Sequence, residues 1–349
     1  MSGLYETNTT LLETAIAQSA EAALESVAEA RAAIATVIFG QTQVVEETLV
    51  TLLAGGHGLL VGVPGLAKTK LVETLGIVLG LDARRVQFTP DLMPADILGS
   101  EIMDEGTDGR RSFRFVRGPI FAQLLMADEI NRASPRTQSA LLQAMQEFHV
   151  SVAGERHDLP RPFHVLATQN PLEQEGTYPL PEAQLDRFLM QIDVLYPDRV
   201  AERKILIETT SDRSAIAKPS MGADDLMAIQ RLVRRLPVGD SVVEAILDLV
   251  RSARPGESGD GAPTSVAARD LAKDVARDVA WGPGPRAAQA LMLACRARAL
   301  VDGRLAPSLD DVKALAEPVL KHRMALTFAA RAEGRTLSDV IARLANRLG

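Results

Sequence analysis

The sequence contains a single cysteine, Cys295, so the chain cannot form an internal disulfide. Chains without disulfides are typical of reducing compartments. We interpret Cys295 as a small buried hydrophobic residue in a helix. Aromatic residues make up only 4% of the chain, so aliphatic side chains have to form most of the hydrophobic core.

Long apolar runs and a positive net charge are also missing. No stretch approaches the ~18 apolar residues of a membrane-spanning helix, and the N-terminus lacks the basic start and apolar stretch of a secretory signal. We therefore expect a cytoplasmic protein with no transmembrane segment. The formal net charge of −7 argues against broad binding of nucleic acid, although it leaves room for a local basic patch.

The pattern of apolar residues divides the chain into three parts. Residues 9–37 are rich in Ala and Glu, with apolar residues at helical spacing, which predicts one or two amphipathic helices, and we assign 1–31 as an N-terminal helical extension. From 32 to 197, short apolar runs alternate with helical patterns, which predicts an α/β domain with a parallel sheet flanked by helices. From 198 to 349 the periodicity is helical, with no convincing strand, which predicts a second domain that is all-helical.

A phosphate-binding loop is predicted at residues 62–70, in the stretch GVPGLAKTK. Gly62, Lys68 and Thr69 fit the pattern G-x-x-x-x-G-K-[ST], whereas Ala67 replaces the second glycine. An apolar strand precedes the loop and a helix follows it, and we expect Ala67 to adopt a helix-start conformation. The predicted nucleotide contacts are Gly62, Val63, Pro64, Gly65, Leu66, Ala67, Lys68, Thr69 and Lys70. A glycine-rich turn before an ordinary helix is the alternative.

Two adjacent acids end a buried strand in the stretch LLMADE. Such a pair is costly beside apolar residues unless a cation or hydrogen-bond donors face it. We expect Asp128 and the Thr69 hydroxyl to hold Mg²⁺, Lys68 to reach the β- and γ-phosphates of ATP, and Glu129 to polarise the attacking water. A solvated acid pair at a loop start is the alternative.

The loop, the acids and the stretch TQNP all follow predicted strands. Ligands of parallel sheets bind at the carboxyl ends of the strands. The three segments are therefore expected to face one ligand.

The chain resembles the MoxR-type AAA+ ATPases from about Thr36 onward, in the stretches GVPGLAKT, LLMADEINRA, LATQNP, LPEAQLDRF and GPGPRA. The resemblance implies a P-loop AAA+ core with a C-terminal helical lid domain. It implies an ATPase that hydrolyses Mg-ATP as a homo-oligomeric, hexameric ring. It also implies chaperone-like remodelling or maturation of a protein client, with a von Willebrand factor A domain protein as a frequent partner.

The same resemblance assigns catalytic roles to three further residues. Asn170 matches the sensor-1 residue that orients the attacking water, Arg187 matches the arginine finger that reaches a neighbouring subunit, and Arg286 matches the sensor-2 arginine of the lid. From the residues alone, each has an ordinary alternative. Asn170 could form a turn before Pro171, Arg187 could pair with Asp186 at the surface, and Arg286 could be a surface residue at a helix start.

Other predictions are less specific. Phe39, Gly40 and Gln41 occupy the place of a nucleoside contact, although a turn between helices fits them nearly as well. Arg132 and Arg136 could face a phosphate in trans, with surface solvation as the alternative. The stretches 91–118 and 148–165 are predicted to contain hairpins of the kind that line the pore of the ring. Three histidines lie outside metal-binding spacing: His149, His157 and His164.

Two other functions are compatible with the same nucleotide site. One is an assembly switch or scaffold that cycles slowly, which the rate of ATP turnover would distinguish. The other is a nucleic-acid motor of related fold, against which the acidic net charge counts.

Overall fold

A computed structural model describes residues 2–105, 111–173, 175–210, 217–256 and 266–348, with only the backbone described for 2–18 and 266–269. The helices are α1 (Ser2–Ala35), α2 (Thr42–Leu53), α3 (Lys68–Val78), α4 (Pro94–Leu98), α5 (Pro135–Glu147), α6 (Glu182–Leu185), α7 (Arg199–Thr209), α8 (Ala223–Arg235), α9 (Asp240–Ser252), α10 (Val266–Asp278), α11 (Pro285–Val301), α12 (Leu309–Leu320), α13 (Phe328–Ala332) and α14 (Leu337–Ala345). Two short 3₁₀ turns are η1 (Ile130–Arg132) and η2 (Lys321–Arg323).

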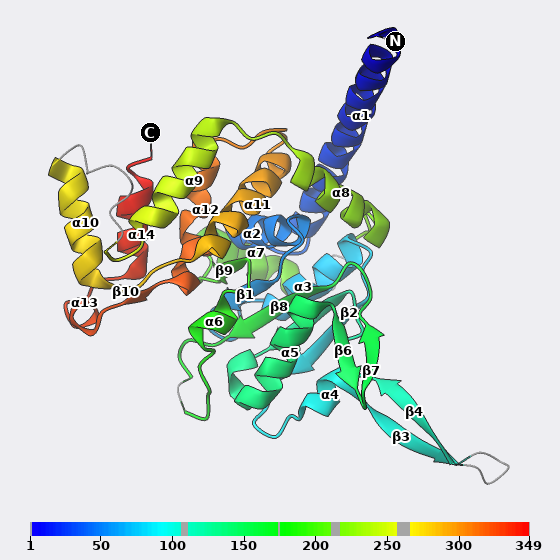
Figure 1. Ribbon diagram of the computed structural model, residues 1–349. Helices are drawn as coiled ribbons and strands as arrows, with labels where there is room; N and C mark the ends of the chain where they lie inside the picture. The colour runs from blue at the N-terminus through cyan, green and yellow to red at the C-terminus, as the bar shows by residue number, and fades with distance from the viewer. Residues whose placement is uncertain (1, 106–110, 174, 211–216, 257–265, 349) are drawn as a thin grey trace.

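Five parallel strands form the central sheet, in the spatial order β2-β5-β8-β1-β9. Their bounds are β1 (Gly58–Val61), β2 (Ala83–Gln87), β5 (Leu124–Asp128), β8 (His164–Gln169) and β9 (Met190–Asp193). Figure 1 shows the sheet with helices around it and the C-terminal helices gathered at one side. The predicted α/β fold with a parallel sheet is confirmed.

Alternate residues of the strands belong to two different hydrophobic clusters. Leu60 and Leu124 belong to the cluster that includes α2, α3 and the C-terminal helices. Leu59 and Leu125 belong to the cluster that includes α4 and α5. Because successive strand residues point to opposite faces, both faces of the sheet are covered.

The helix α5 begins as the sequence predicts. Ser134 is the N-cap, and its hydroxyl accepts a hydrogen bond from the Thr137 backbone N–H, while Pro135 is the first helical residue. The helix thus begins seven residues after the end of β5, with η1 between them.

The N-terminal segment forms one helix, α1, that continues to Ala35. Its buried residues recur at helical spacing and join the larger core: Ala20, Ala23, Val27, Ala30 and Ile34. The helix contacts α2, α3, α8 and α11, so this part of the chain packs against both the sheet domain and the C-terminal helices.

The C-terminal region is helical, as predicted, apart from one short antiparallel pair. Strand β10 (Val279–Trp281) pairs with β11 (Ala325–Leu326), which the sequence did not reveal. Cys295 is fully buried on α11, and burial raises the pKa of its thiol, which confirms its interpretation as a buried hydrophobic residue.

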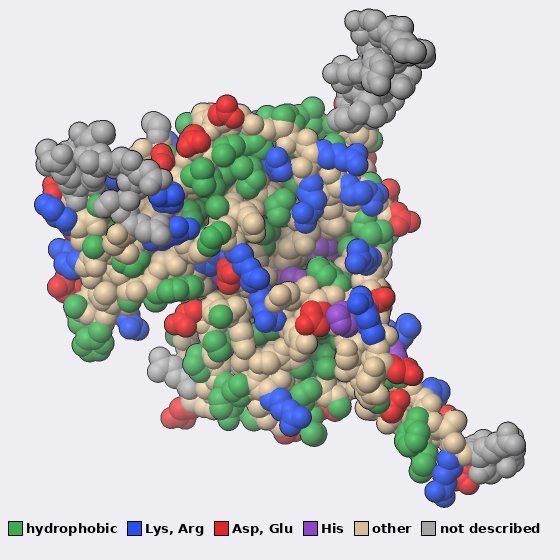
Figure 2. All heavy atoms as spheres, in the orientation of Figure 1, with side chains coloured by type: hydrophobic (Ala, Val, Ile, Leu, Met, Phe, Trp, Pro, Cys, Tyr) green, Lys and Arg blue, Asp and Glu red, His purple; other side chains and the backbone are tan. Residues whose placement is uncertain are grey.

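Two hairpins extend from the sheet domain. The first consists of β3 (Gly99–Glu105) and β4 (Arg111–Arg117), and the second of β6 (His149–Val152) and β7 (Glu155–Asp158). Both were predicted, although the turn at 106–110 lies outside the described residues. Figure 2 shows the first hairpin projecting from one corner, with hydrophobic and charged side chains on its surface.

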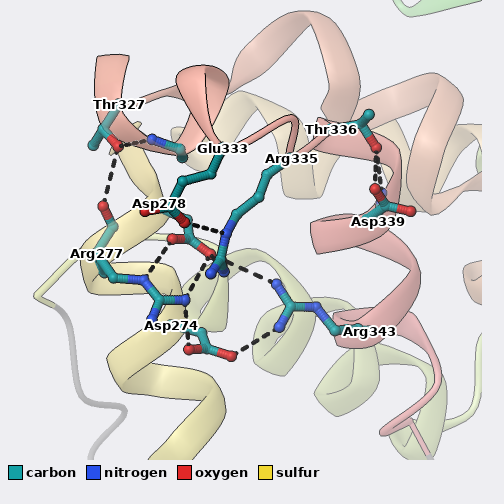
Figure 3. Close-up of polar contacts among 10 residues, drawn as sticks. Asp274, Arg277, Asp278, Thr327, Glu333, Arg335, Thr336, Asp339 and Arg343 are labelled. Carbon is teal, nitrogen blue, oxygen red and sulfur yellow. Dashed lines mark hydrogen bonds and ion pairs between the residues drawn. The ribbon is translucent and has the colours of Figure 1, made fainter.

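Ion pairs stabilise the end of the C-terminal region (Figure 3). The Asp278 carboxylate is buried and pairs with Arg277, Arg335 and Arg343. These arginines come from α10, the segment after α13, and α14, so the cluster ties three parts of the chain together. Among the described residues, no helix is both long and apolar enough to cross a membrane.

Candidate nucleotide-binding site

The predicted phosphate loop connects β1 to α3 at the carboxyl edge of the sheet. Gly62 lies so close to the end of β9 that a Cβ atom there would stand 2.5 Å from the Val194 carbonyl oxygen. Its backbone N–H donates to the Gln169 carbonyl at 3.1 Å. Gly65 has a φ of +83°, which favours glycine. Both glycines are therefore required by the loop's conformation.

Ala67 departs from our expectation. It does not adopt a helix-start conformation but a left-handed one, with φ 58° and ψ 20°. This backbone costs an L-residue about 1–2 kcal/mol. Alanine therefore replaces the second glycine of the motif at a position where glycine would adopt the backbone conformation more easily. The phosphate loop carries this backbone strain at Ala67.

Lys68 is the first residue of α3, and its side chain turns back onto the loop. The ammonium donates to the carbonyl oxygens of Gly62 and Val63, the latter at 3.1 Å. Burial lowers its pKa, whereas the negative charges of Asp128 and Glu129 act in the opposite direction. The lysine thus lies within electrostatic range of the predicted acid pair.

Asp128 ends β5 and is held by two neighbouring strands. Its Oδ1 accepts a hydrogen bond from the Thr168 hydroxyl of β8 at 2.6 Å. Its Oδ2 accepts from Arg85 of β2, through Nη2 at 2.6 Å and Nε at 3.1 Å. A cation and a hydroxyl therefore compensate the buried carboxylate, as its position requires.

Glu129 follows in a left-handed conformation, with φ 55°. Its backbone N–H donates to the Thr168 hydroxyl at 2.8 Å. Its Oε2 accepts from the Gln87 amide at 2.7 Å and from Arg132 at 3.2 Å. The strained backbone separates the two acid side chains, so that each has its own set of partners.

Three of these partners were missed by the sequence analysis: Arg85, Gln87 and Thr168. Arg85 and Gln87 alternate on β2, which runs beside β5, and Thr168 precedes the predicted Asn170 by two residues. Their polarity at strand ends was a visible signal, but only the strand order shows that they face the acids.

Asn170 lies just after β8 and is buried. Its Oδ1 accepts a hydrogen bond from the Leu172 N–H at 3.1 Å, which forms the turn around Pro171 that we considered as an alternative. The Gln169 carbonyl before it bonds to Gly62. The sheet therefore places Asn170 at the same edge as the loop.

The predicted nucleoside segment packs against the chain that leaves β9. Lys204 of α7 lies over the Phe39 ring, 4.5 Å from its centroid, and the Gln41 amide donates to the Leu195 carbonyl at 2.9 Å. Gly40 has a positive φ and lies against Ala201. Since Val194 touches Gly62, this segment adjoins the phosphate loop.

Arg286 of α11 lies beside Asp186, the residue that precedes Arg187. Arg286 lies 3.6 Å from the Asp186 carboxylate, and buried Arg323 donates to the same carboxylate at 2.7 Å. Arg187 is half-buried, and its guanidinium forms no hydrogen bond or ion pair with any residue that the structure describes. The Asp186–Arg187 surface pair that we considered is accordingly not found there.

The donor set fits magnesium. The Thr69 hydroxyl and the Asp128 carboxylate offer hard oxygen ligands, and Mg²⁺ commonly uses one or two carboxylates plus phosphates and waters. No group of three or more His, Cys, Asp or Glu suited to a metal occurs within the described ranges. Arg132 is engaged by Glu129, and Arg136 is exposed on α5.

The parallel sheet, the phosphate loop and the neighbouring acids are the features of an AAA ATPase. Residues 57–190 match the family described as "ATPase family associated with various cellular activities (AAA)", and residues 271–344 match the "AAA lid domain".

Known proteins are similar over most of the chain. Chaperone MoxR1 of Mycobacterium tuberculosis is 43% identical over 309 residues, covering 88% of this chain and 78% of that one. Protein MoxR of Paracoccus denitrificans is 32% identical, covering 86% and 88%. The crystal structure of a candidate ATPase from Cytophaga hutchinsonii has a TM-score of 0.85 at 34% identity, covering 97% and 98%. The chain belongs to the MoxR-type AAA+ ATPases.

Proposed function

We propose that this protein binds and hydrolyses Mg-ATP at the carboxyl edge of its sheet. The position of Lys68 and the Asp128–Glu129 pair at the same carboxyl edge of the sheet carries the proposal, because it supplies a cation for phosphate and a base for water at one edge. The loop residues 62–70 bind the phosphates, and the segment 39–41 contacts the nucleoside. The AAA+ core is taken as 32–197, the lid as 198–349 and the N-terminal extension as 1–31.

Hydrolysis proceeds by in-line attack of water on the γ-phosphate. Glu129 accepts the proton of that water, and Asn170 orients it through its side-chain amide. Lys68 leaves its carbonyl acceptors and donates to the phosphates. Thr69 and Asp128 hold Mg²⁺, which neutralises charge on the β- and γ-phosphates when bound.

The working unit is a ring of six copies. Arg187 reaches the γ-phosphate of the next subunit, where an arginine finger is worth about 10³–10⁵ in rate in GTPases. The Arg187 side chain has no partner within the described chain, which leaves its guanidinium available for this contact. Arg286 supplies the contact of the lid with the nucleotide, and loss of the γ-phosphate is coupled to movement of the lid.

The substrate of the ring is a protein client, which it remodels or matures in the cytoplasm, together with a von Willebrand factor A domain partner. Membership of the chaperone-containing MoxR family supports this role. The β3–β4 hairpin offers a client surface, because Met103 and Phe113 face each other across the strands and both are exposed.

The rate of ATP turnover tests the proposed ATPase activity. The wild type is expected to release phosphate from Mg-ATP, whereas Glu129→Gln is expected to bind ATP and release phosphate at least about 100-fold more slowly. Gln keeps the size of the side chain and the contact with Gln87, so it removes the base selectively. Equal rates for both proteins would show that Glu129 is not the base, and slow release by both would favour the assembly switch.

A further inference from the structure

Arg323 is buried in η2 and contacts the segment 186–189 that carries Arg187. Its Nε donates to the Asp186 carboxylate at 2.7 Å. Its Nη2 donates to the carbonyls of Asp186 at 3.3 Å and Phe188 at 2.7 Å. Its Nη1 donates to the carbonyls of Leu189 at 3.1 Å and Val319 at 2.6 Å.

These contacts use the whole donor set of the side chain. A guanidinium has five N–H donors in a rigid planar arrangement, and each has an acceptor here. Four of the five acceptors lie in the segment 186–189, on both sides of Arg187. The remaining acceptor is in the preceding turn of the lid, on α12, so the arginine joins the lid to the Arg187 segment.

The neighbours of Arg323 reinforce this junction. His322 contacts the same Phe188 carbonyl through Nε2 at 3.1 Å. Lys321 contacts the Asp193 carboxylate at the end of β9, and η2 as a whole contacts α6. The turn formed by Lys321, His322 and Arg323 therefore fixes the chain from α6 to β9.

We propose that Arg323 is a positioning residue for the arginine finger. It holds the backbone at 186–189 and the Asp186 carboxylate, so that Arg187 projects toward the nucleotide of the next subunit. This proposal rests on the proposed function of Arg187. Because no acceptor of Arg323 belongs to the phosphate loop or the acid pair, loss of Arg323 is expected to impair the neighbour's site and to leave the phosphate loop and the acids of its own site intact.

Subunit mixing separates these effects. Arg323→Met alone is expected to lower kcat at least about tenfold while changing the Kd for Mg-ATP less than about threefold. Glu129→Gln alone has an intact finger and an inactive site. Mixed in equal amounts, the two variants restore about one site in four, because an intact site and an intact neighbouring finger must coincide across a head-to-tail interface.

A second variant tests whether the loss of activity in Arg323→Met results from misfolding. Asp186→Asn removes the negative charge that faces Arg323 and keeps a side-chain oxygen and the carbonyl contacts, so it is expected to show the same complementation with a smaller loss of kcat. The matched control is Arg335→Met. It disrupts a different arginine–carboxylate pair of the lid, the one between Arg335 and Asp278. It is expected to lower the melting temperature without a selective loss of kcat.

The outcomes distinguish the inference from the function on which it rests. Arg187→Ala mixed with Glu129→Gln must complement if Arg187 acts in trans, and its failure would refute the finger itself. If that pair complements but mixtures with Arg323→Met and Asp186→Asn stay inactive, Arg323 does not act through the finger. Wild-type kcat in both variants alone would overturn the proposal as well.

Discussion

At the scale of single residues, Ala67 offers a direct test of backbone strain. Its left-handed conformation favours glycine, so Ala67→Gly is expected to raise the free energy of unfolding by about 1 kcal/mol and to preserve Mg-ATP binding. Urea denaturation measures this change.

The control for this prediction is another exposed alanine, Ala342, which lies within α14. There the same substitution should lower the free energy of unfolding by about 0.5–1 kcal/mol, because glycine weakens a right-handed helix. Destabilisation at both positions would contradict the strain at Ala67.

Thr168 connects the two acids, since its hydroxyl donates to Asp128 and accepts from the Glu129 N–H. Thr168→Val keeps the shape and leaves both groups without this partner, so it should cost about 1–3 kcal/mol of stability and weaken Mg-ATP binding. Thr168→Ser, which keeps the hydroxyl, should stay close to wild type. Equal loss in both variants would mean that the methyl group, rather than the hydroxyl, matters.

These residues also show what the sequence could not predict. The motifs identified Lys68, Asp128 and Glu129 by residue type and spacing. The φ angle of Ala67 depends on the conformation of the whole phosphate loop, so the sequence alone does not predict it. Arg323 and Asp186 are 137 positions apart, and no local pattern joins them.

At the scale of elements, the pH response of α2 can be predicted. The pKa of Glu47 is raised from 4.5 to about 7, chiefly by burial; a hydrogen bond from Gln43 opposes the rise, and the charges of Asp193 and Glu317 contribute to it. A raised carboxyl pKa means that its stabilising effect is present below pH 4.5 and is lost as the pH rises through 7.

Glu47→Gln therefore should stabilise the protein at pH 8 by about 2–3 kcal/mol and change little near pH 4.5. Thermal unfolding at the two pH values measures the difference. The same shift at both would show that the charge of Glu47 is not responsible.

The elements themselves were largely predictable. Strand β5 and its following helix α5 were visible from an apolar run, an acid pair and the Ser134–Pro135 cap. The pair β10–β11 was missed because two- and three-residue strands are too short to show an alternating pattern. The order of the strands in the sheet could not be predicted from the sequence either. The contacts of Arg85 and Gln87 depend on that order, so they could not be predicted.

At the scale of the whole molecule, the ring predicts a separation of assembly from catalysis. Arg187→Ala should form the same ATP-dependent oligomer as wild type, because Arg187 contributes to the transition state more than to the ground state. Its turnover should fall at least about 100-fold. Mass measurement with and without ATP, paired with phosphate release, tests both statements.

A ring that forms while Arg187→Ala hydrolyses normally would refute the finger. A monomer at all ATP concentrations, with normal turnover, would refute the shared site.

The central claim is that Lys68, Thr69, Asp128, Glu129 and Asn170 surround one Mg-ATP molecule. Calorimetric titration with Mg-ATP tests it most directly, in wild type and in Lys68→Ala, with and without a magnesium chelator. The account predicts one nucleotide bound per chain, weakened at least about tenfold by the substitution and by removal of magnesium. No uptake by the wild type, or equal uptake by Lys68→Ala, would contradict it.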